Sequence, residues 1–169
     1  DLMHLLSESY NQHVRYGTAM CLGIACAGTH NVEAYNIIEP LLNDPSPLVR
    51  QGAFIAGGMI FSQINSKVEP KFDLFKENLD KVNANKEEHN LIKLGALVSQ
   101  GILELGGKNC VLSLISQTGH NRVGAIIGLA LFTQYYYWFP MAHFLSLAIS
   151  PIVHMGIDES FKVVKNFQI

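Results

Sequence analysis

The sequence carries little charge. Only 15% of its 169 residues are Asp, Glu, Lys or Arg, against a usual share of roughly 25%. The formal net charge is −2 and the isoelectric point is about 6.4. Neither value provides the basic excess with which proteins bind nucleic acid or anionic membranes, so neither partner is expected. A chain this poor in charge is expected to be covered over much of its surface, by its own elements or by neighbours.

Cysteine is scarce, and the three copies, Cys21, Cys26 and Cys110, cannot all pair with one another. All three lie in apolar stretches of helical period, which favours free and buried thiols over disulfides. Free thiols are typical of a reducing compartment, so the cytoplasm and nucleus are the expected locations. The chain opens partway through an amphipathic pattern and not with a secretory signal, so we expect a segment of a longer protein.

Charge is missing altogether over one long stretch, residues 123–157. Uninterrupted apolar runs of this length usually indicate a membrane helix. Here Pro140 splits the run, Gln134 and His143 make it amphipathic, and no basic cluster flanks it. These features favour a buried core or a covered interface. A membrane span is the less favoured alternative.

Motifs of known catalytic or ligand-binding chemistry are missing too. The seven histidines include no pair at the spacing of a zinc site. The sequence has no glycine-rich phosphate loop, no nucleophile elbow and no evident pair of carboxylates for acid–base chemistry. We therefore predict no catalytic residue, no cofactor site and no metal site, and we expect that the protein is not an enzyme.

What the sequence does contain is one short motif written four times: a basic residue, any residue, a glycine and a small residue. The copies of this glycine motif begin at Arg15, Arg50, Lys93 and Arg122, and each opens an apolar stretch of helical length. The motif glycines are 35, 43 and 29 residues apart. In the first three copies a second glycine, the trailing glycine, follows six residues later. Self-similarity at this spacing is typical of solenoids and closed repeat arrays.

The glycines of the motif are best explained by helix packing. A glycine inside a helix costs about 1 kcal/mol relative to alanine, and only close packing can offset that cost repeatedly. Each motif glycine has a small residue four positions later on the same helix face, as Gly52 has Ala56, and such small stripes let helix backbones approach closely. We predict a packing role for eight glycines: Gly17, Gly23, Gly52, Gly58, Gly95, Gly101, Gly124 and Gly128.

The basic residue of each motif lies in the first turn of its helix, where an unpaired positive charge is unfavourable. One hypothesis is a row of bases that contacts a partner or an anion. The preferred hypothesis is that the row connects neighbouring repeats through salt bridges or backbone carbonyls. The row consists of Arg15, Arg50, Lys93 and Arg122, and the candidate acids are Glu8, Glu39, Asp44 and Glu88.

Aromatic residues are concentrated between Phe132 and Phe139, with six in eight residues. That is more than one helix face can bury. The favoured interpretation is a plug that fills the interior of the array or its junction with a following segment. The alternative is an anchor patch for a partner. The candidate contact residues are Tyr135, Tyr136, Trp138 and Phe139.

Helical period extends through residues 1–151, where amphipathic helices alternate with glycine-rich apolar ones. Asn11 and Asn31 are expected to cap helices, and Gly28 is expected to end one in a left-handed conformation. Residues 110–115 are predicted to form a short apolar helix.

After Pro151 the period changes towards alternation, so residues 152–169 are predicted to enter a β-rich segment. The predicted fold is an all-α repeat, a solenoid or toroid of helix pairs, with a short β-rich segment at its C-terminal end. The predicted domains are 1–151 for the helical array and 152–169 for the entry into the β segment.

With its trailing glycine, the motif in residues 15–25 and 50–58 resembles the proteasome/cyclosome repeat. Residues 118–148 resemble, more specifically, the region of the larger of that family's two proteasome scaffolds where the last repeats lead into a β-rich domain. The fourth copy, without a trailing glycine, resembles a terminal capping repeat. The resemblance implies a closed α-solenoid of two concentric helix rings without catalytic activity.

The resemblance also implies a function. It is that of a scaffold in the proteasome regulatory particle, which holds the other subunits in place for ubiquitin-dependent degradation. The expected partners are those other subunits. The alternative function is a helical-repeat module that binds ubiquitin, a ubiquitin-like domain or a peptide. Because part of an array exposes two unfinished faces, self-association of the isolated chain is also expected.

Overall fold

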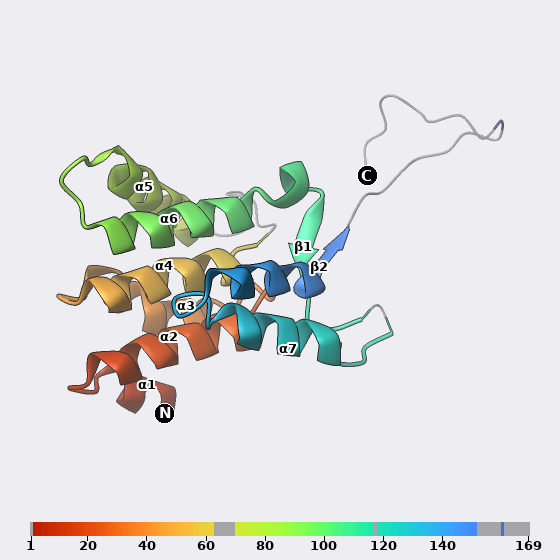
Figure 1. Cartoon of the computed structure of the whole chain (residues 1–169), viewed down its shortest axis with the longest axis horizontal. Coiled ribbons are helices and arrows are strands. Elements are labelled where there is room, and N and C mark those ends of the chain that lie inside the picture. Colours follow the sequence, from red (N-terminus) through yellow and green to blue (C-terminus); the bar gives the residue numbers. More distant parts are fainter. Residues whose placement is uncertain (1, 63–69, 117, 152–159, 161–169) are drawn as a thin grey trace.

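A computed structural model describes residues 2–62, 70–116, 118–151 and 160 (Figure 1). Its α-helices are α1 (Leu2–Ser7), α2 (Gln12–Ala25), α3 (Val32–Ile38), α4 (Pro47–Ile60), α5 (Pro70–Ala84), α6 (Asn90–Leu103) and α7 (Val123–Phe132). Its 3-10 helices are η1 (Glu39–Asn43), η2 (Leu105–Lys108) and η3 (Phe139–Ala148), and its strands are β1 (Cys110–Leu112) and β2 (Ile149–Pro151). The predicted class, a helical repeat with a short β element, is confirmed.

Local signals in the sequence set several helix ends as expected. Asn11 caps α2 by accepting a hydrogen bond from the His13 amide at 2.9 Å. Asn31 caps α3 by accepting one from the Ala34 amide at 3.1 Å. After α2 the chain turns at Gly28, whose φ of 67° is a conformation that glycine adopts without a Cβ penalty. These ends place α2 and α4 in the same direction, as a repeat requires.

The core is built around α4, which packs against α2 on one side and α6 on the other (Figure 1). On one face of this three-helix layer lie α1, α3 with η1, and α5, so an amphipathic helix precedes each glycine-rich one. The aromatic centre of that face is formed by Tyr35, Phe54, Phe61 and Phe75, all at most 2% exposed. Ring pairs such as Tyr35 with Phe61, 4.5 Å between centroids, fill the space that the small residues of the layer leave.

The opposite face of the layer is covered by α7 and η3, which pack against each other. Met20 of α2, Ile55 and Met59 of α4 and Ile102 of α6 meet Leu129 of α7 in a second apolar cluster. The helix of the fourth glycine motif therefore lies on the face of the three-helix layer, not beside α6 as its next member.

One local prediction is wrong, and a second lies almost wholly outside the described residues. Residues 110–115 do not form a helix: residues 110–112 are strand β1, which pairs antiparallel with β2 in the register Cys110↔Pro151, Val111↔Ser150 and Leu112↔Ile149. The partner strand is distant in the sequence, so local periodicity carries no sign of it. The β element accordingly begins before residue 152, and the predicted β segment 152–169 lies outside the described residues apart from Ser160.

The cysteines are less buried than expected. Cys21 lies on the exposed side of α2, whereas Cys26, just after α2, and Cys110, in β1, are partly exposed. In the uncharged run, α7 ends at Phe132 and Pro140 lies in η3. Among the helices that the structure describes, none has both the length and the hydropathy needed to cross a bilayer.

Close approach between α2 and α4 occurs at two glycines. A methyl group added to Gly23, the trailing glycine of α2, would lie 2.7 Å from the Cα of Ala56 in α4. One added to Gly52, the motif glycine of α4, would lie 2.6 Å from the ring of Tyr16 in α2. Real Cβ atoms do not come this close to other heavy atoms, so glycine is what permits the two helices to touch at this distance.

The same pattern is repeated one helix further along. A methyl group on Gly58, the trailing glycine of α4, would lie 3.0 Å from the Cα of Ser99 in α6. One on Gly95, the motif glycine of α6, would lie 2.8 Å from the Cα of Gln51 in α4. In each interface, the trailing glycine of the earlier helix lies against the later helix, at the residue four positions after that helix's motif glycine. The motif glycine of the later helix lies against the middle residue of the earlier helix's motif.

The four remaining predicted glycines fall into two groups, one with a close neighbour and one without. A methyl group on Gly128 would lie 2.6 Å from the Phe144 carbonyl oxygen, so this glycine brings α7 against η3. Packing roles for Gly17, Gly101 and Gly124 stay predictions, because a methyl group on each would meet no atom of the described residues within 4 Å. Gly17 and Gly101 lie on the outer sides of α2 and α6, and Gly124 lies on the exposed side of α7, where no described helix follows.

The packing pattern predicts opposite effects for two alanine substitutions. Gly95→Ala should lower the free energy of unfolding by about 1–3 kcal/mol, because the new methyl group pushes against the backbone of α4. Gly124→Ala is the matched control in open space and should raise that free energy by up to about 1 kcal/mol through helix propensity. Urea unfolding followed by circular dichroism measures both. A stabilising Gly95→Ala would contradict the close packing.

Candidate interaction site: the basic row and the aromatic turn

Arg15, the first member of the basic row, is held by both of its neighbouring segments. Its Nε and Nη2 donate to the two carboxylate oxygens of Asp44 at 2.7 and 3.0 Å, a bidentate pair. Its Nη1 donates to the carbonyl oxygens of Ser9 and Tyr10 at 2.7 and 3.0 Å. The side chains of Arg15 and Asp44 are only 15% and 7% exposed. The loop before α2 and the loop before α4 are thereby joined through one guanidinium group.

This arrangement lowers the pKa of Asp44. Burial alone would raise the pKa of Asp44, but hydrogen bonds from Arg15 and from the Ser46 amide, together with the charge of Arg15, lower it below its ordinary value of 3.8. The hydrogen bond to Asp44 in turn raises the pKa of Arg15. Both groups are therefore charged at neutral pH, and the pair is a partly shielded ion pair.

Arg50 repeats the construction one helix later. Its Nε donates to the Leu42 carbonyl oxygen at 3.0 Å, in the segment before its own helix. Its Nη1 donates to a carboxylate oxygen of Glu88 at 3.0 Å, in the loop before α6. Arg15 and Arg50 therefore form the same clasp: each ties its own preceding segment to an acid in the loop before the next glycine-rich helix.

The last two members of the row make only part of this clasp. Lys93 donates to the Lys86 carbonyl oxygen at 2.9 Å, in the loop before α6. Arg122 donates to the Ser113 carbonyl oxygen at 3.1 Å and to the hydroxyl of Ser150, so it braces the β1–β2 pair. Neither has an acidic partner among the described residues.

The candidate acids are placed as follows. Asp44 and Glu88 pair with the row, as predicted. Glu39 pairs instead with Lys71 at 3.0 Å. Glu8 is exposed and makes no ion pair within the part of the chain that the structure describes. Every member of the row donates to at least one carbonyl oxygen of the chain, but only Arg15 and Arg50 reach the loop before a later glycine-rich helix, as the repeat-connecting hypothesis requires.

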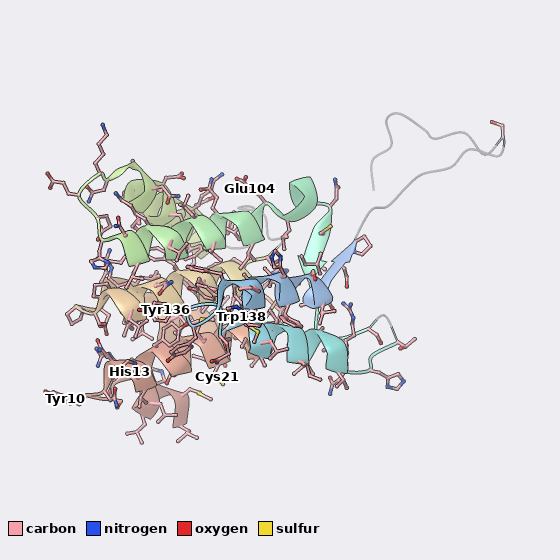
Figure 2. The ribbon with its side chains drawn as sticks, in the orientation of Figure 1. Tyr10, His13, Cys21, Glu104, Tyr136 and Trp138 are labelled. Atoms are coloured by element: carbon pink, nitrogen blue, oxygen red, sulfur yellow. The ribbon has the colours of Figure 1, made fainter. Side chains whose placement is uncertain are left out.

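The aromatic turn after α7 has a buried and an exposed part. Phe132 and Tyr135 are 3% and 5% exposed and stack at 5.4 Å between ring centroids. Tyr136, Trp138 and Phe139 are more than half exposed, and Figure 2 labels Tyr136 and Trp138 near the turn between α7 and η3. The interior-plug interpretation therefore fits Tyr135, which points into the molecule. The anchor-patch interpretation fits the aromatic residues that follow it, which point outward.

Sequence reasoning missed the middle residues of the motif. Tyr16 and Gln51 are the surfaces against which the next motif glycines pack. Gln51 is 1% exposed, and its side-chain amide donates to the hydroxyl of Tyr135. Burial raises the pKa of Tyr135, so that hydroxyl remains protonated. A polar residue in an otherwise apolar helix was the signal, but its partner, distant in the sequence, could not be found from the sequence.

The described residues offer little for chemistry. Among them, no group of three or more His, Cys, Asp or Glu side chains is arranged to hold a metal ion. Burial raises the pKa of the Cys26 thiol, which disfavours the nucleophilic thiolate.

The clasp at Arg15 predicts a pH-dependent contribution to stability. Asp44→Asn should lower the free energy of unfolding at neutral pH by about 2 kcal/mol, the net value of hydrogen bonds to a charged group. Because folding lowers the pKa of Asp44, the contribution is complete above 3.8 and is lost as pH falls through the folded-state pKa. The difference between wild type and variant should therefore shrink in acid, as measured by denaturant unfolding across pH.

The control for this prediction is Glu39→Gln, which removes the more exposed ion pair with Lys71. The side chains of Lys71 and Glu39 are 34% and 46% exposed, so its loss should change the free energy of unfolding by less than about 1 kcal/mol. Equal losses from the two substitutions would mean that the clasp has no special role.

Comparison with known proteins agrees with this architecture. Residues 17–51 match the model of the proteasome/cyclosome repeat. The chain is 48% identical, over 97% of its length, to 26S proteasome non-ATPase regulatory subunit 1 of Drosophila melanogaster. It is 45% identical over 97% of its length to homolog A of that subunit in Arabidopsis thaliana. It is 43% identical over 99% to the regulatory subunit RPN2 of Saccharomyces cerevisiae.

The aligned part is a small share of each relative. The chain covers 16% of the Drosophila and Arabidopsis proteins and 18% of the yeast protein, so it spans about one sixth of the curated relatives that it matches. The chain therefore contains a match to the proteasome/cyclosome repeat and is similar over nearly its whole length to proteasome regulatory subunits.

Proposed function

We propose that this chain is part of a non-catalytic scaffold subunit of the proteasome regulatory particle, acting in the cytoplasm and nucleus. The observation that carries the proposal is the identity of 43–48% over nearly the whole chain to proteins named as regulatory subunits of the 26S proteasome, two of them as non-ATPase subunits. In this function the chain holds other regulatory particle subunits in position for ubiquitin-dependent degradation.

The structure supports a mechanical function in two ways. The glycines bring α2, α4 and α6 into backbone contact, which resists shear because a close-packed interface has few alternative arrangements. The clasps of Arg15 and Arg50 then fix each helix pair to the next at the loops. A layer built in this way carries binding surfaces at fixed separations.

The alternative, a module that binds ubiquitin or a peptide through the basic row, has less support. Arg15 and Arg50 use their guanidinium donors on acceptors within the chain. A ligand would have to displace those contacts before it could bind there. The exposed aromatics of the turn are the better candidates for subunit contact, because large apolar side chains dominate interface energetics.

Co-purification of the full-length protein tests the proposal. The tagged protein, isolated from the cells that express it, should bring down proteasome regulatory particle subunits in stoichiometric amounts, as measured by quantitative mass spectrometry. The double substitution Tyr137→Ser/Phe139→Ser, at side chains 83% and 77% exposed, should reduce that recovery while circular dichroism stays unchanged. Tyr10→Ser, at an equally exposed but isolated ring, is the control.

Recovery without any proteasome subunit would contradict the scaffold function. Stoichiometric recovery of ubiquitin, abolished by Arg50→Ala with assembly intact, would favour the alternative module.

A further inference from the structure

The aromatic turn, residues 133–138, gets its shape from hydrogen bonds that stay close to it in the sequence. Its backbone amides donate to carbonyl oxygens of residues 129–134, and the hydroxyl of Thr133 donates to the Ala130 carbonyl oxygen at 2.7 Å. Such bonds do not fix where the turn lies on the three-helix layer. Within the described residues, one hydrogen bond joins the turn to that layer: the side-chain amide of Gln51 in α4 donates to the hydroxyl of Tyr135.

Gln51 makes no other side-chain hydrogen bond in the part of the chain that the structure describes. The residue is 1% exposed, and its Oε1 is buried without a partner there. A buried amide with one unpaired oxygen is costly compared with an apolar side chain of similar size. Packing alone therefore does not account for a glutamine at this position. The bond to Tyr135 does account for it.

The place of Gln51 is fixed from the other side by α6. A methyl group added to Gly95 would lie 2.8 Å from the Cα of Gln51 and 3.0 Å from its Cγ. The backbone of α6 thus lies directly against the stem of the Gln51 side chain and limits its rotamers. The amide is presented at one point of the layer, and that point depends on the distance between α4 and α6.

The hydrogen bond gives Tyr135 a direction that its apolar contacts do not supply. Tyr135 is 5% exposed, stacks on Phe132 at 5.4 Å between ring centroids, and belongs to the cluster that contains Ile55 and Met59 of α4. Apolar contact is non-directional, so a ring in such a cluster can shift at little cost. A hydrogen bond requires a particular distance and angle, and it therefore selects one position of the ring.

The corresponding residue of the first motif supports the same turn. Tyr16, the middle residue on α2, packs against the cluster that contains Tyr135, and its ring receives Gly52 of α4. Burial raises the pKa of Tyr16, and the nearby Tyr137 hydroxyl raises it further. The middle residues of two successive motifs thus meet the turn, Tyr16 by packing and Gln51 by a directed bond.

The exposed rings follow Tyr135 closely along the chain. Tyr137 and Phe139 come two and four residues later and are 83% and 77% exposed. A change in the position of Tyr135 therefore moves these rings relative to the layer.

We propose that Gln51 is the positioning residue of the aromatic turn, and that its bond to Tyr135 holds the exposed rings in the orientation that a partner subunit binds. The binding of a subunit rests on the proposed function, whereas the positioning does not.

Hydrogen–deuterium exchange of the full-length protein, followed by mass spectrometry, tests the positioning. In Gln51→Leu and in Tyr135→Phe the amides of residues 133–138 should exchange about tenfold faster, because the turn loses its hydrogen bond to the layer. Tyr136→Phe removes a hydroxyl one residue further on that makes no hydrogen bond among the described residues, and it should leave the exchange unchanged. Wild-type exchange at the turn in both Gln51→Leu and Tyr135→Phe would overturn the proposal.

The double variant Gln51→Leu/Tyr135→Phe separates positioning from stability. Each single variant leaves a buried polar group unpaired, so the amides of α4 should also exchange faster. The double variant removes both polar groups, so its α4 amides should return to within about twofold of wild type. Its turn should still exchange about tenfold faster than wild type, because no directed bond remains. A turn with wild-type exchange in the double variant would show that packing alone positions it, and would contradict the proposal.

Co-purification of the double variant tests the consequence for binding. Recovery of regulatory particle subunits should fall at least about threefold, although every exposed aromatic residue is still present. Unchanged recovery together with a faster-exchanging turn would contradict the claim that orientation matters for binding. A wild-type protein that recovers no subunit would contradict the proposed function, and the exchange rates would still decide whether Gln51 positions the turn.

Discussion

Contact between helix backbones at α4 is the constraint on which the rest of the structure depends. Gly23 and Gly95 reach the backbone of α4 from its two sides, at Ala56 and Gln51. Because the helices touch at this distance, they form one closely packed layer. The aromatic cluster packs on one face of this layer, and α7 with η3 packs on the other. A Cβ in these gaps would separate the helices and loosen both clusters, since protein interiors are close-packed.

The clasps also hold the loops at the ends of the packed helices in fixed positions relative to one another. Close packing already limits the relative movement of the helices, and a bidentate pair such as Arg15 with Asp44 also holds one loop at one distance from the next. The pair is mostly shielded from water, so it is worth more than an ordinary surface ion pair. Packing sets how near the helices lie, and the clasps set their register. The proposed scaffold function needs both, because a scaffold keeps separate contact surfaces at constant positions.

The helix ends that the sequence predicted correctly depend on contacts between residues close together in the chain. Asn11, Asn31 and Gly28 end their helices through contacts within a few residues, and each is visible in the sequence. Features that depend on contacts between residues distant in the sequence were not predicted. Strand β1 exists because β2 pairs with it, and the side-chain amide of Gln51 donates to the hydroxyl of Tyr135, far along the chain. The exposure of Cys21 was also missed, because an apolar helix does not reveal which of its faces is covered.

By itself, the sequence determined the repeat, the helix pairs and the residue types that bring helices together, because these follow from period, helix cost and side-chain size. Tertiary structure alone decided which glycines are used. Gly58 and Gly101 occupy the same place in the motif, yet only Gly58 has a described helix against it. It also decided that α7 covers the layer and does not extend it. The physical reason is that a motif specifies the shape of one surface, whereas packing depends on which second surface the rest of the chain brings to it.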